Sequence, residues 1–512
     1  MIIMSSFWIE STKDNGKSKI ITQNYNVDVC IIGAGMAGLS IGYYLSKKGI
    51  KVLIVDKKSE IGAATSGNTT AKITLQHNLI YDYLINEFGE DFALKYYESN
   101  KQAISNIKQI IEDEKIDCDF EYVPNYVYTT DVEEILKIEK EVDAINMLEN
   151  KLTKEKPAKF ITESELPFKI TAGIKLENQS QFHPRKYMFG LVKAIEKYNG
   201  MIFTDSLVTD VKRESDGYIT CVNKNTIKSK YVVLASHYPF INFPGLYFSK
   251  MYQVTSYSIA IELENNTITG MYISSNEPTL SFRTAKYGNK KLLIVAGGNH
   301  KTGFSPDSDE NYGYRFLENQ INKLFPKAKT LYRWNTKDCI TLDKIPYIGE
   351  FSFFKTNMYV ATGFNKWGMT ASNIAGNIIT DSIIGNINKY AEIYDSTRIE
   401  PIKNKEEVTN MAKQVVNSYI NNRIKIPKED LSAIKKDNGG IIKIDGKSVG
   451  IYKSIQGDIF AVNPTCTHLG CLLTWNNVDK TWDCPCHGSR FDFTGKNIYD
   501  PALKDLEIMS LD

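Results

Sequence analysis

Two short apolar runs near the start of the chain flank a helical stretch. Residues 27–32 are largely apolar and rich in β-branched side chains, and a glycine-rich turn separates them from residues 39–48. Gly49 ends the helical stretch, and a second apolar run at residues 51–55 leads to an acidic residue. Apolar runs of this length on both sides of a helical period predict a strand, a helix and a second, parallel strand.

The periodicity changes after this unit. Residues 78–150 repeat apolar positions at helical spacing, and a strand-like stretch at residues 120–128 interrupts them. Residues 252–297 alternate with a period of two, which predicts an antiparallel sheet. From residue 428 the chain reads as short strands, so we expect a small all-β module there. Its predicted turns lie at residues 438–440, 445–446 and 456–457.

The turn after the first strand reads Gly33-Ala34-Gly35-Met36-Ala37-Gly38, and the second strand closes on Asp56. Gly33 permits a tight turn, Gly35 lets the backbone approach a pyrophosphate, and Gly38 lets helix and strand pack closely. Phosphates would sit at the N-terminus of the helix, and Asp56 would accept hydrogen bonds from ribose hydroxyls. Strand, turn, helix, strand and acid in this order predict a dinucleotide site.

Two boxes of Cys and His occur near the C-terminus, Cys466-Thr467-His468-Leu469-Gly470-Cys471 and Cys484-Pro485-Cys486-His487-Gly488-Ser489. Four of the eight cysteines and two of the six histidines fall within residues 466–487. This spacing brings thiolates and imidazoles together on one inorganic centre. A four-ligand zinc site is the alternative, because Zn²⁺ takes the same ligand types. Zinc boxes do not normally use this spacing, and a second cysteine pair has no role in them.

The two boxes resemble the Rieske [2Fe–2S] family, in which two His replace two Cys on one iron. The resemblance implies that Cys466 and Cys484 bind one iron and that His468 and His487 bind the other. Neutral imidazole adds no negative charge to its iron, so the oxidised cluster is easier to reduce than an all-cysteine cluster.

Three further positions of the Rieske resemblance carry expectations. Cys471 and Cys486 match a pair that forms a disulfide between the cluster loops in the quinol-oxidising branch of the family. Ser489 matches a residue whose hydroxyl donates to a cluster sulfur. High-potential members carry Tyr where this chain has Phe491. The missing hydrogen bond predicts a potential in the lower half of the Rieske range.

Three segments after the dinucleotide unit resemble the glycine oxidase and D-amino-acid oxidase superfamily. They are the small, hydroxyl-rich loop at residues 62–72, the D-x-x-P-x-I-G stretch at residues 343–349, and residues 359–370. The resemblance implies a Rossmann-like α/β domain that binds FAD, with an antiparallel sheet over the flavin. A helix starting near Gly368 would direct its positive end at the flavin N1/C2 carbonyl. The implied FAD-binding residues are Gly33, Gly35, Met36, Ala37, Gly38, Asp56, Lys57, Ser66, Thr69, Thr70, Val208, Gly363, Gly368, Met369 and Thr370.

The predicted organisation has four parts, a leader, an FAD-dependent oxidoreductase domain, a linker helix and a Rieske domain. The leader comprises residues 1–24, the oxidoreductase domain 25–390, the linker helix 391–427 and the Rieske domain 428–512. Within the oxidoreductase domain, the nucleotide-binding parts are residues 25–77, 180–240 and 340–390, and the substrate subdomain is about 78–179 and 250–339. A chain of 512 residues with 42% hydrophobic residues can bury two cores. The net charge of +2 gives no reason to expect nucleic acid as a partner. Without a bilayer-spanning apolar run or a signal-peptide pattern, we expect a soluble, cytoplasmic protein.

Two residues of the predicted sheet are candidates for contact with substrate. His300 lies at the end of a strand, and Arg283 could hold a carboxylate through its two-pronged guanidinium. A structural histidine and a strand-edge charge are the alternatives.

The sequence thus favours an FAD-dependent dehydrogenase acting on a CH–NH group of an amine or amino-acid-like substrate. Electrons would leave singly through the cluster to an external acceptor protein. Two alternatives remain open at this point: a redox sensor or electron-transfer adaptor without its own substrate, and a reductase that receives electrons through the cluster.

Overall fold

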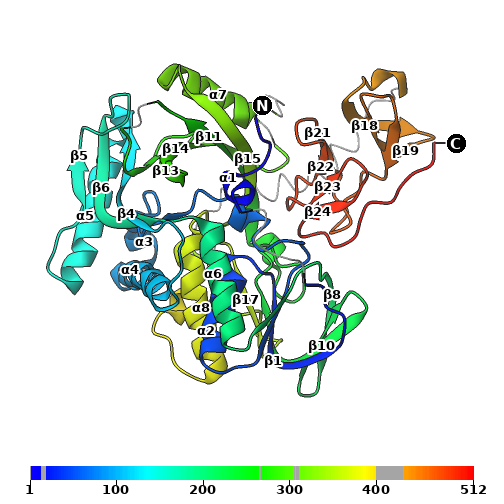
Figure 1. Cartoon of the computed structure of the whole chain (residues 1–512), viewed down its shortest axis with the longest axis horizontal. Coiled ribbons are helices and arrows are strands. Elements are labelled where there is room, and N and C mark those ends of the chain that lie inside the picture. Colours follow the sequence, from blue (N-terminus) through cyan, green and yellow to red (C-terminus); the bar gives the residue numbers. More distant parts are fainter. Residues whose placement is uncertain are drawn as a thin grey trace.

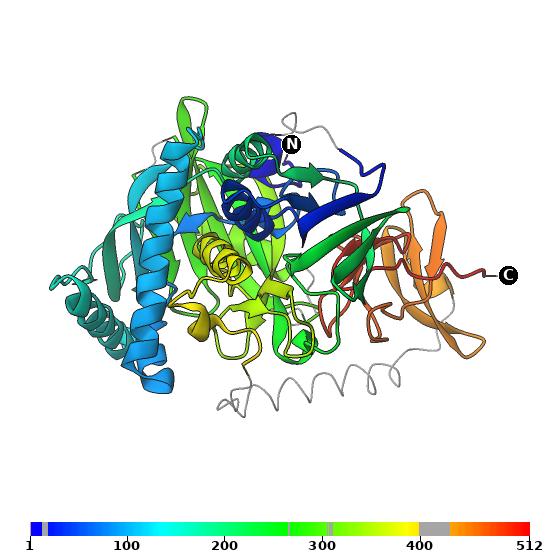
Figure 2. The same cartoon turned by 90° about the horizontal axis from the view of Figure 1, so that it is seen from below.

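The computed structural model of the chain describes residues 2–12, 19–264, 267–304, 306, 311–398 and 431–511. From residue 399 to its end, the predicted linker helix lies outside the described residues. The described chain forms a large N-terminal part with two sheets and a smaller C-terminal part beside it (Figure 1). Figure 2 shows the C-terminal strands, orange to red, at the opposite end of the molecule from the long blue helix of residues 90–113.

The first sheet collects strands from distant stretches of the chain. Its parallel strands follow the order β17, β10, β1, β2 and β7, with β16 antiparallel at one edge and β8 and β9 continuing antiparallel from β10. The central strands are buried on both faces, which explains their continuous apolar runs. The strands are β1 (Tyr25–Ile32), β2 (Val52–Val55), β7 (Met201–Phe203), β8 (Val208–Glu214), β9 (Gly217–Val222), β10 (Asn225–Leu234), β16 (Tyr347–Glu350) and β17 (Met358–Thr362).

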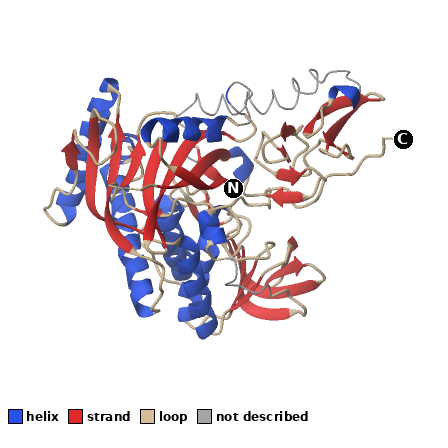
Figure 3. Ribbon diagram, turned by 45° about the horizontal axis from the view of Figure 1, so that its top comes forward, coloured by secondary structure: helices blue, strands red, loops and turns tan. Residues whose placement is uncertain are grey.

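Helices pack together beside this sheet and confirm the predicted strand–helix–strand unit. Helix α2 is buried along nearly its whole length, because α6 and α8 both pack against it. Figure 3 shows the helices gathered in the N-terminal part. The helices are α1 (Phe7–Glu10), α2 (Met36–Lys47), α3 (Tyr81–Phe88), α4 (Glu90–Asp113), α5 (Ile135–Leu152), α6 (Pro184–Lys197), α7 (Tyr312–Leu324) and α8 (Gly368–Ile384). In the described parts of the chain, none of them is long and apolar enough to cross a bilayer.

The second sheet is the predicted antiparallel one. Its order is β15, β11, β14, β13, β12, β4, β6 and β3, with β5 pairing β6; β12 and β4 are parallel and the other neighbours antiparallel. The strands are β3 (Lys72–Ile73), β4 (Glu121–Thr129), β5 (Lys159–Ile161), β6 (Ala172–Gln181), β11 (Met251–Glu262), β12 (Met271–Ser274), β13 (Leu280–Tyr287), β14 (Lys290–Lys301) and β15 (Lys329–Thr341).

The C-terminal part is almost entirely strands and loops, as predicted (Figure 3). Its two small sheets contain β18 (Asn438–Ile444), β19 (Lys447–Lys453) and β20 (Ile459–Val462), and β21 (Thr474–Asn476), β22 (Thr481–Asp483), β23 (Arg490–Asp492) and β24 (Asn497–Tyr499). The turn predicted at residues 438–440 is wrong, because these residues begin β18. Gly439 serves packing there, since a Cβ on it would lie 2.6 Å from the Trp475 ring.

The beginning of the chain packs on the core, although the sequence pattern suggested a leader. Helix α1 buries Phe7 and Trp8. The Trp8 indole N–H donates to the carbonyl of Thr69 at 2.7 Å, and the Ser6 hydroxyl donates to the carbonyl of Gly67. Residues 6–8 therefore brace the predicted flavin loop from outside.

Candidate flavin pocket and iron–sulfur centre

The glycine turn after β1 has the geometry that the sequence predicts. Gly33 has a φ of +113°, and a Cβ on it would lie 2.4 Å from the carbonyl oxygen of Ala235. A Cβ on Gly38 would lie 1.9 Å from the carbonyl oxygen of Gly33, so neither position admits a side chain. Asp56, at the end of β2, accepts hydrogen bonds from the main-chain N–H groups of Ala34 at 2.6 Å and Lys58 at 2.8 Å. These bonds hold its carboxylate beside the turn.

A pocket opens at the carboxyl ends of the parallel strands, where α/β sheets place their ligands. Most of the predicted flavin-binding residues line it, whereas Gly38, Thr70 and Thr370 are not among its described lining residues. The predicted residues that line it are Gly33, Gly35, Met36, Ala37, Asp56, Lys57, Ser66, Thr69, Val208, Gly363, Gly368 and Met369.

Two helices begin at this pocket, and neither N-cap residue caps its helix with its own side chain. The N-caps are Gly35 for α2 and Trp367 for α8. The Met36 N–H donates to the Ser66 hydroxyl at 3.0 Å, and other N–H groups of the first turn of α2 have no partner within the helix. Such helix ends attract negative charge, so α2 suits the pyrophosphate of FAD and α8 suits the carbonyl end of the isoalloxazine ring. The residues present therefore fit FAD.

The pocket also contains polar residues that the sequence analysis did not assign to it, notably His237, Asp338, Cys339 and Lys366. The Cys339 sulfur lies 3.2 Å from Nε2 of His237. Burial raises the pKa of the Cys339 thiol and lowers the pKa of His237, so both groups are neutral near pH 7. No local pattern distinguishes Asp338 and Cys339, because β15 reads as an ordinary alternating strand, and no motif assigns a role to His237 or Lys366, which lie in loops.

The contacts of Arg283 are with main-chain carbonyls and favour a structural role over substrate binding. Its guanidinium is buried, and Nη1 donates to the carbonyls of Thr70 and Ala71, each at 2.8 Å, and of Phe182 at 3.3 Å. Nε donates to the carbonyl of Thr284 at 2.9 Å. These bonds connect the predicted flavin loop with β13 and with the end of β6, so the guanidinium stabilises the fold here.

The ring nitrogens of His300 are also engaged. Nε2 lies 2.9 Å from the Tyr257 hydroxyl, and Nδ1 lies 2.9 Å from the carbonyl of Lys301. Within the described residues, neither His300 nor Arg283 lines the flavin pocket.

Two loops of the C-terminal part carry the Cys and His boxes. Main-chain hydrogen bonds close each loop, from Cys466 N–H to Cys471 O and from Cys484 N–H to Ser489 O, both at 2.8 Å. A disulfide joins Cys471 to Cys486, which confirms the predicted pair. The sulfurs of Cys471, Cys484 and Cys486 lie within 4.8 Å of one another, but the disulfide leaves Cys484 alone among the three able to bind a metal as a thiolate.

The four predicted cluster ligands come together at the tips of these loops. Cys466 and Cys484 are buried, at 2% and 1% exposure, and the interaction between the two thiols lowers the pKa of Cys466 and raises the pKa of Cys484. The rings of His468 and His487 lie 5.1 Å apart. Burial lowers their pKa values to about 4 and about 3, so both imidazoles are neutral.

Each of these two histidines has a buried Nδ1 without a hydrogen-bond partner among the described residues. A buried, unpaired ring nitrogen is costly unless it binds something. Two thiols and two neutral imidazoles with free Nδ1 atoms form the donor set of a Rieske centre, so the residues present fit a [2Fe–2S] cluster.

The N-terminal part contacts the ligand loops directly. Nε2 of His468 lies 2.7 Å from Oδ1 of Asn242, which requires the proton on Nε2 and leaves Nδ1 free. The His487 ring packs against those of Tyr238 and Phe248, at centroid distances of 6.3 and 5.9 Å. All three contacting residues belong to the connection between β10 and β11.

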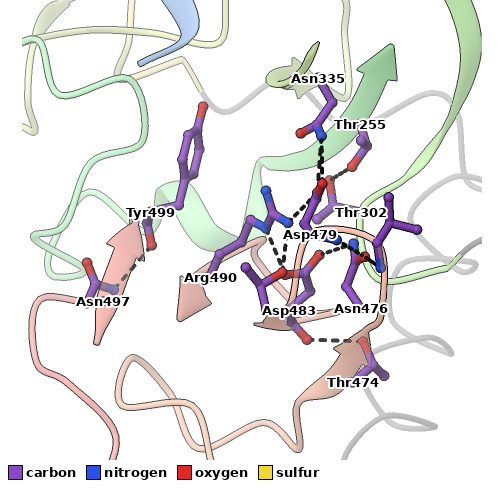
Figure 4. Close-up of polar contacts among 12 residues, drawn as sticks. Thr255, Thr302, Asn335, Thr474, Asn476, Asp479, Asp483, Arg490, Asn497 and Tyr499 are labelled. Atoms are coloured by element: carbon purple, nitrogen blue, oxygen red, sulfur yellow. Dashed lines mark hydrogen bonds and ion pairs between the residues drawn. The ribbon is translucent and has the colours of Figure 1, made fainter. Parts of the chain in front are cut away.

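A second contact between the parts involves buried charges (Figure 4). Arg490 forms ion pairs with Asp483 at 2.7 Å and Asp479 at 2.6 Å. Asn335 of β15 donates to Asp479 at 3.1 Å, so the network continues into the second sheet. The ion pair with Arg490 holds the Asp479 carboxylate in place within the C-terminal part, and its hydrogen bond from Asn335 links the two parts.

Comparison with known proteins decides the family. The family described as FAD dependent oxidoreductase matches residues 28–382, and the Rieske [2Fe-2S] domain matches residues 426–510. The chain belongs to the FAD-dependent oxidoreductase family. It is therefore an FAD-dependent oxidoreductase with a C-terminal Rieske domain, and the predicted cofactors, FAD and a [2Fe–2S] cluster, are confirmed.

Three proteins illustrate what the chain is similar to. The Bacillus subtilis (strain 168) protein YhfW, whose name describes a Rieske 2Fe-2S iron-sulfur protein, is 33% identical over 99% of this chain and 98% of its own length. Gamma-glutamylputrescine oxidoreductase of Escherichia coli (strain K12) is 22% identical over 75% of this chain and 90% of its own. The solved structure of glycine oxidase from Geobacillus kaustophilus shares the fold with a TM-score of 0.59 and 18% identity, covering 73% of this chain and all of that one.

Proposed function

We propose that this FAD-dependent oxidoreductase oxidises an amine or amino-acid-like substrate and passes the electrons singly through its Rieske domain to an external acceptor protein. When bound, FAD supplies two-electron oxidation of a C–N bond and the cluster supplies one-electron transfer. Oxidation of a CH–NH group removes a hydride from carbon and a proton from nitrogen, leaving an imine. The two electrons then reduce two molecules of a one-electron acceptor.

The dipeptide His237-Tyr238 carries this proposal. His237 lines the flavin pocket, and the ring of the next residue, Tyr238, lies 6.3 Å from the ring of the proposed iron ligand His487. Cys339, another pocket residue, contacts His237 at 3.2 Å. Electron transfer through protein weakens steeply with distance, and one dipeptide here joins the two cofactor sites.

The substrate class rests on the relatives. Two of the similar proteins are gamma-glutamylputrescine oxidoreductase and glycine oxidase, and both names denote a substrate that contains an amine. Each similarity covers about three quarters of this chain, a share close to that of the FAD-dependent oxidoreductase part at residues 28–382. The proposed ligands Cys466, His468, Cys484 and His487 add the one-electron outlet.

An anaerobic screen tests the proposal. The purified holoprotein is mixed with amines, amino acids and hydroxy acids, and the flavin absorbance is followed without oxygen. We expect an amine or amino acid to bleach the flavin, and a one-electron acceptor added afterwards to restore it.

The same screen separates the alternatives. A sensor or adaptor would leave the flavin oxidised with every compound. A reductase would also show no oxidisable substrate, but a reduced electron-donor protein would reduce its flavin through the cluster. Bleaching by a hydroxy acid alone would contradict the proposed CH–NH chemistry.

A further inference from the structure

We propose that the Rieske domain forms one wall of the flavin pocket, so that FAD binding and docking of this domain stabilise each other. The pocket is lined by residues from both parts of the chain. Those contributed by the C-terminal part are Ile498, Tyr499, Asp500 and Leu503. These residues belong to β24 and the segment after it, more than four hundred residues from the glycine turn that lines the same pocket.

Two lysines that follow Asp56, the proposed ribose-binding acid, hold this wall against the N-terminal part. Lys57 and Lys58 come directly after Asp56, and both reach the C-terminal part. Nζ of Lys57 lies 2.5 Å from the Asp500 carboxylate, in a pair whose side chains are 21% and 18% exposed. Nζ of Lys58 donates to the carbonyl of Ile498 at 2.8 Å. Partial burial makes this ion pair stronger than one on an open surface.

Tyr499 attaches the wall at the flavin loop. Its hydroxyl is hydrogen-bonded to the hydroxyl of Thr65, one residue before Ser66, and its ring packs edge-on against His237 at 6.1 Å. Figure 4 shows the Tyr499 ring projecting away from the strand that carries it. Thr65, Tyr499 and His237 all line the pocket, so the aromatic ring closes a gap between the flavin loop and the end of β10.

These contacts have a thermodynamic consequence. FAD bound in this pocket would contact both parts of the chain, because residues 498–500 and 503 line it together with Gly33 and Gly35 of the glycine turn. A ligand that binds the docked arrangement better than the undocked one shifts the equilibrium toward docking, and docking raises the affinity for the ligand by the same factor. Docking also rests on contacts outside the pocket, such as Asn335 with Asp479 and Asn242 with His468. Loss of FAD should therefore loosen residues 498–503 without releasing the whole domain.

FAD titration of full-length, cluster-containing apoprotein tests the wall. We expect Tyr499→Ala to raise the FAD Kd at least about tenfold, and Tyr499→Phe to raise it less, because the ring remains. The matched control is Tyr452→Phe, which removes a hydroxyl bonded to Asp437 at 3.2 Å inside the same domain. The control should leave the Kd within about twofold of the wild-type value. The Rieske absorbance and EPR signals report whether each variant still holds its cluster.

Hydrogen exchange on the wild-type protein gives an independent measurement. FAD removal should speed amide exchange in residues 497–503 and leave β18 and β19 unchanged. The proposal is overturned if exchange there is the same with and without FAD, or if Tyr499→Ala binds FAD as tightly as the wild type. Should Tyr499→Ala lose its cluster, the exchange measurement decides. Neither experiment uses a substrate or an electron acceptor, so the outcome is separate from that of the proposed oxidation.

Discussion

The cluster site and the flavin pocket differ in how far along the chain their residues are spread. The proposed cluster ligands lie between Cys466 and His487, on two loops of one small domain. The residues that line the flavin pocket range from Ile32 to Leu503 and come from both parts of the chain. They lie at the ends of several strands and at the starts of two helices of the N-terminal part. A compact site makes every ligand indispensable, whereas a dispersed site divides its binding energy over many contacts. The two sites should therefore respond differently to single substitutions.

The largest effect is expected at the compact site. Cys466→Ser removes one of two proposed thiolate ligands and should abolish the cluster, because a hydroxyl is a poor iron–sulfur ligand. FAD should remain bound, and substrate should still bleach the flavin in the absence of oxygen. Turnover with a one-electron acceptor protein should fall to the background rate.

The matched control is Cys221→Ser, at a half-buried free cysteine on β9 outside both sites. It should keep the Rieske EPR signal and full turnover. Unchanged turnover in Cys466→Ser would contradict the proposed electron outlet, and loss of FAD would show that the flavin site needs the cluster itself and not only the docked domain.

This difference also explains what could be predicted from sequence. The glycine turn, Asp56 and the two boxes were recognisable because each depends on residues close together in the chain. The disulfide of Cys471 and Cys486 followed from the resemblance of these boxes to Rieske loops. The strand–helix–strand unit and the antiparallel sheet followed from periodicity.

Other features depend on contacts between distant segments, and no local pattern records them. Arg283 reads as a possible substrate ligand on its strand, but its partners are carbonyls of residues 70, 71 and 182. Tyr499 reads as an ordinary strand residue, yet it lines the flavin pocket. Trp8 precedes every motif and still contacts the flavin loop.

A substitution at Trp8, which does not line the flavin pocket, should still lower the affinity of the pocket for FAD. This side chain is 1% exposed, bonds to the Thr69 carbonyl and stacks under the Arg283 guanidinium at 5.1 Å. Trp8→Ala should lower the free energy of unfolding by about 3–5 kcal/mol, as expected for a buried tryptophan. FAD affinity should fall as well, because the loop of residues 65–69 loses its brace.

Thermal unfolding and FAD titration measure these two effects. Phe354→Ala is the control, since this aromatic ring is 79% exposed and its removal should change neither quantity. An unchanged melting temperature for Trp8→Ala would mean that the N-terminal segment is not held on the core. The Rieske EPR signal should be the same in both variants.

The disulfide tests the compact site without touching a proposed ligand. The double variant Cys471→Ser/Cys486→Ser opens a loop of 15 residues, for which chain entropy predicts a loss of about 3 kcal/mol from the stability of the Rieske domain. Loss of the cluster absorbance in guanidinium chloride should occur at lower denaturant than in the wild type, and FAD release should shift in the same direction but by less, because the folded domain forms only one wall of the flavin pocket. Equal midpoints for the cluster would show that the disulfide does not stabilise these loops.

The smallest effect concerns the tuning of the cluster. Phe491 is fully buried in the same apolar cluster as Cys466 and Cys484, and high-potential Rieske proteins carry Tyr at this position. Phe491→Tyr would add a hydroxyl able to donate to a ligand sulfur, which stabilises the more negative, reduced cluster. A hydrogen bond worth about 1 kcal/mol corresponds to about 40 mV for one electron, so the midpoint potential should rise by roughly that amount. Redox titration by EPR measures the shift, with the flavin potential of the same sample as internal reference. If the cluster potential stays constant or falls while the signal shape is preserved, the added hydroxyl does not reach the sulfur, and the expected low potential of this centre must come from another source.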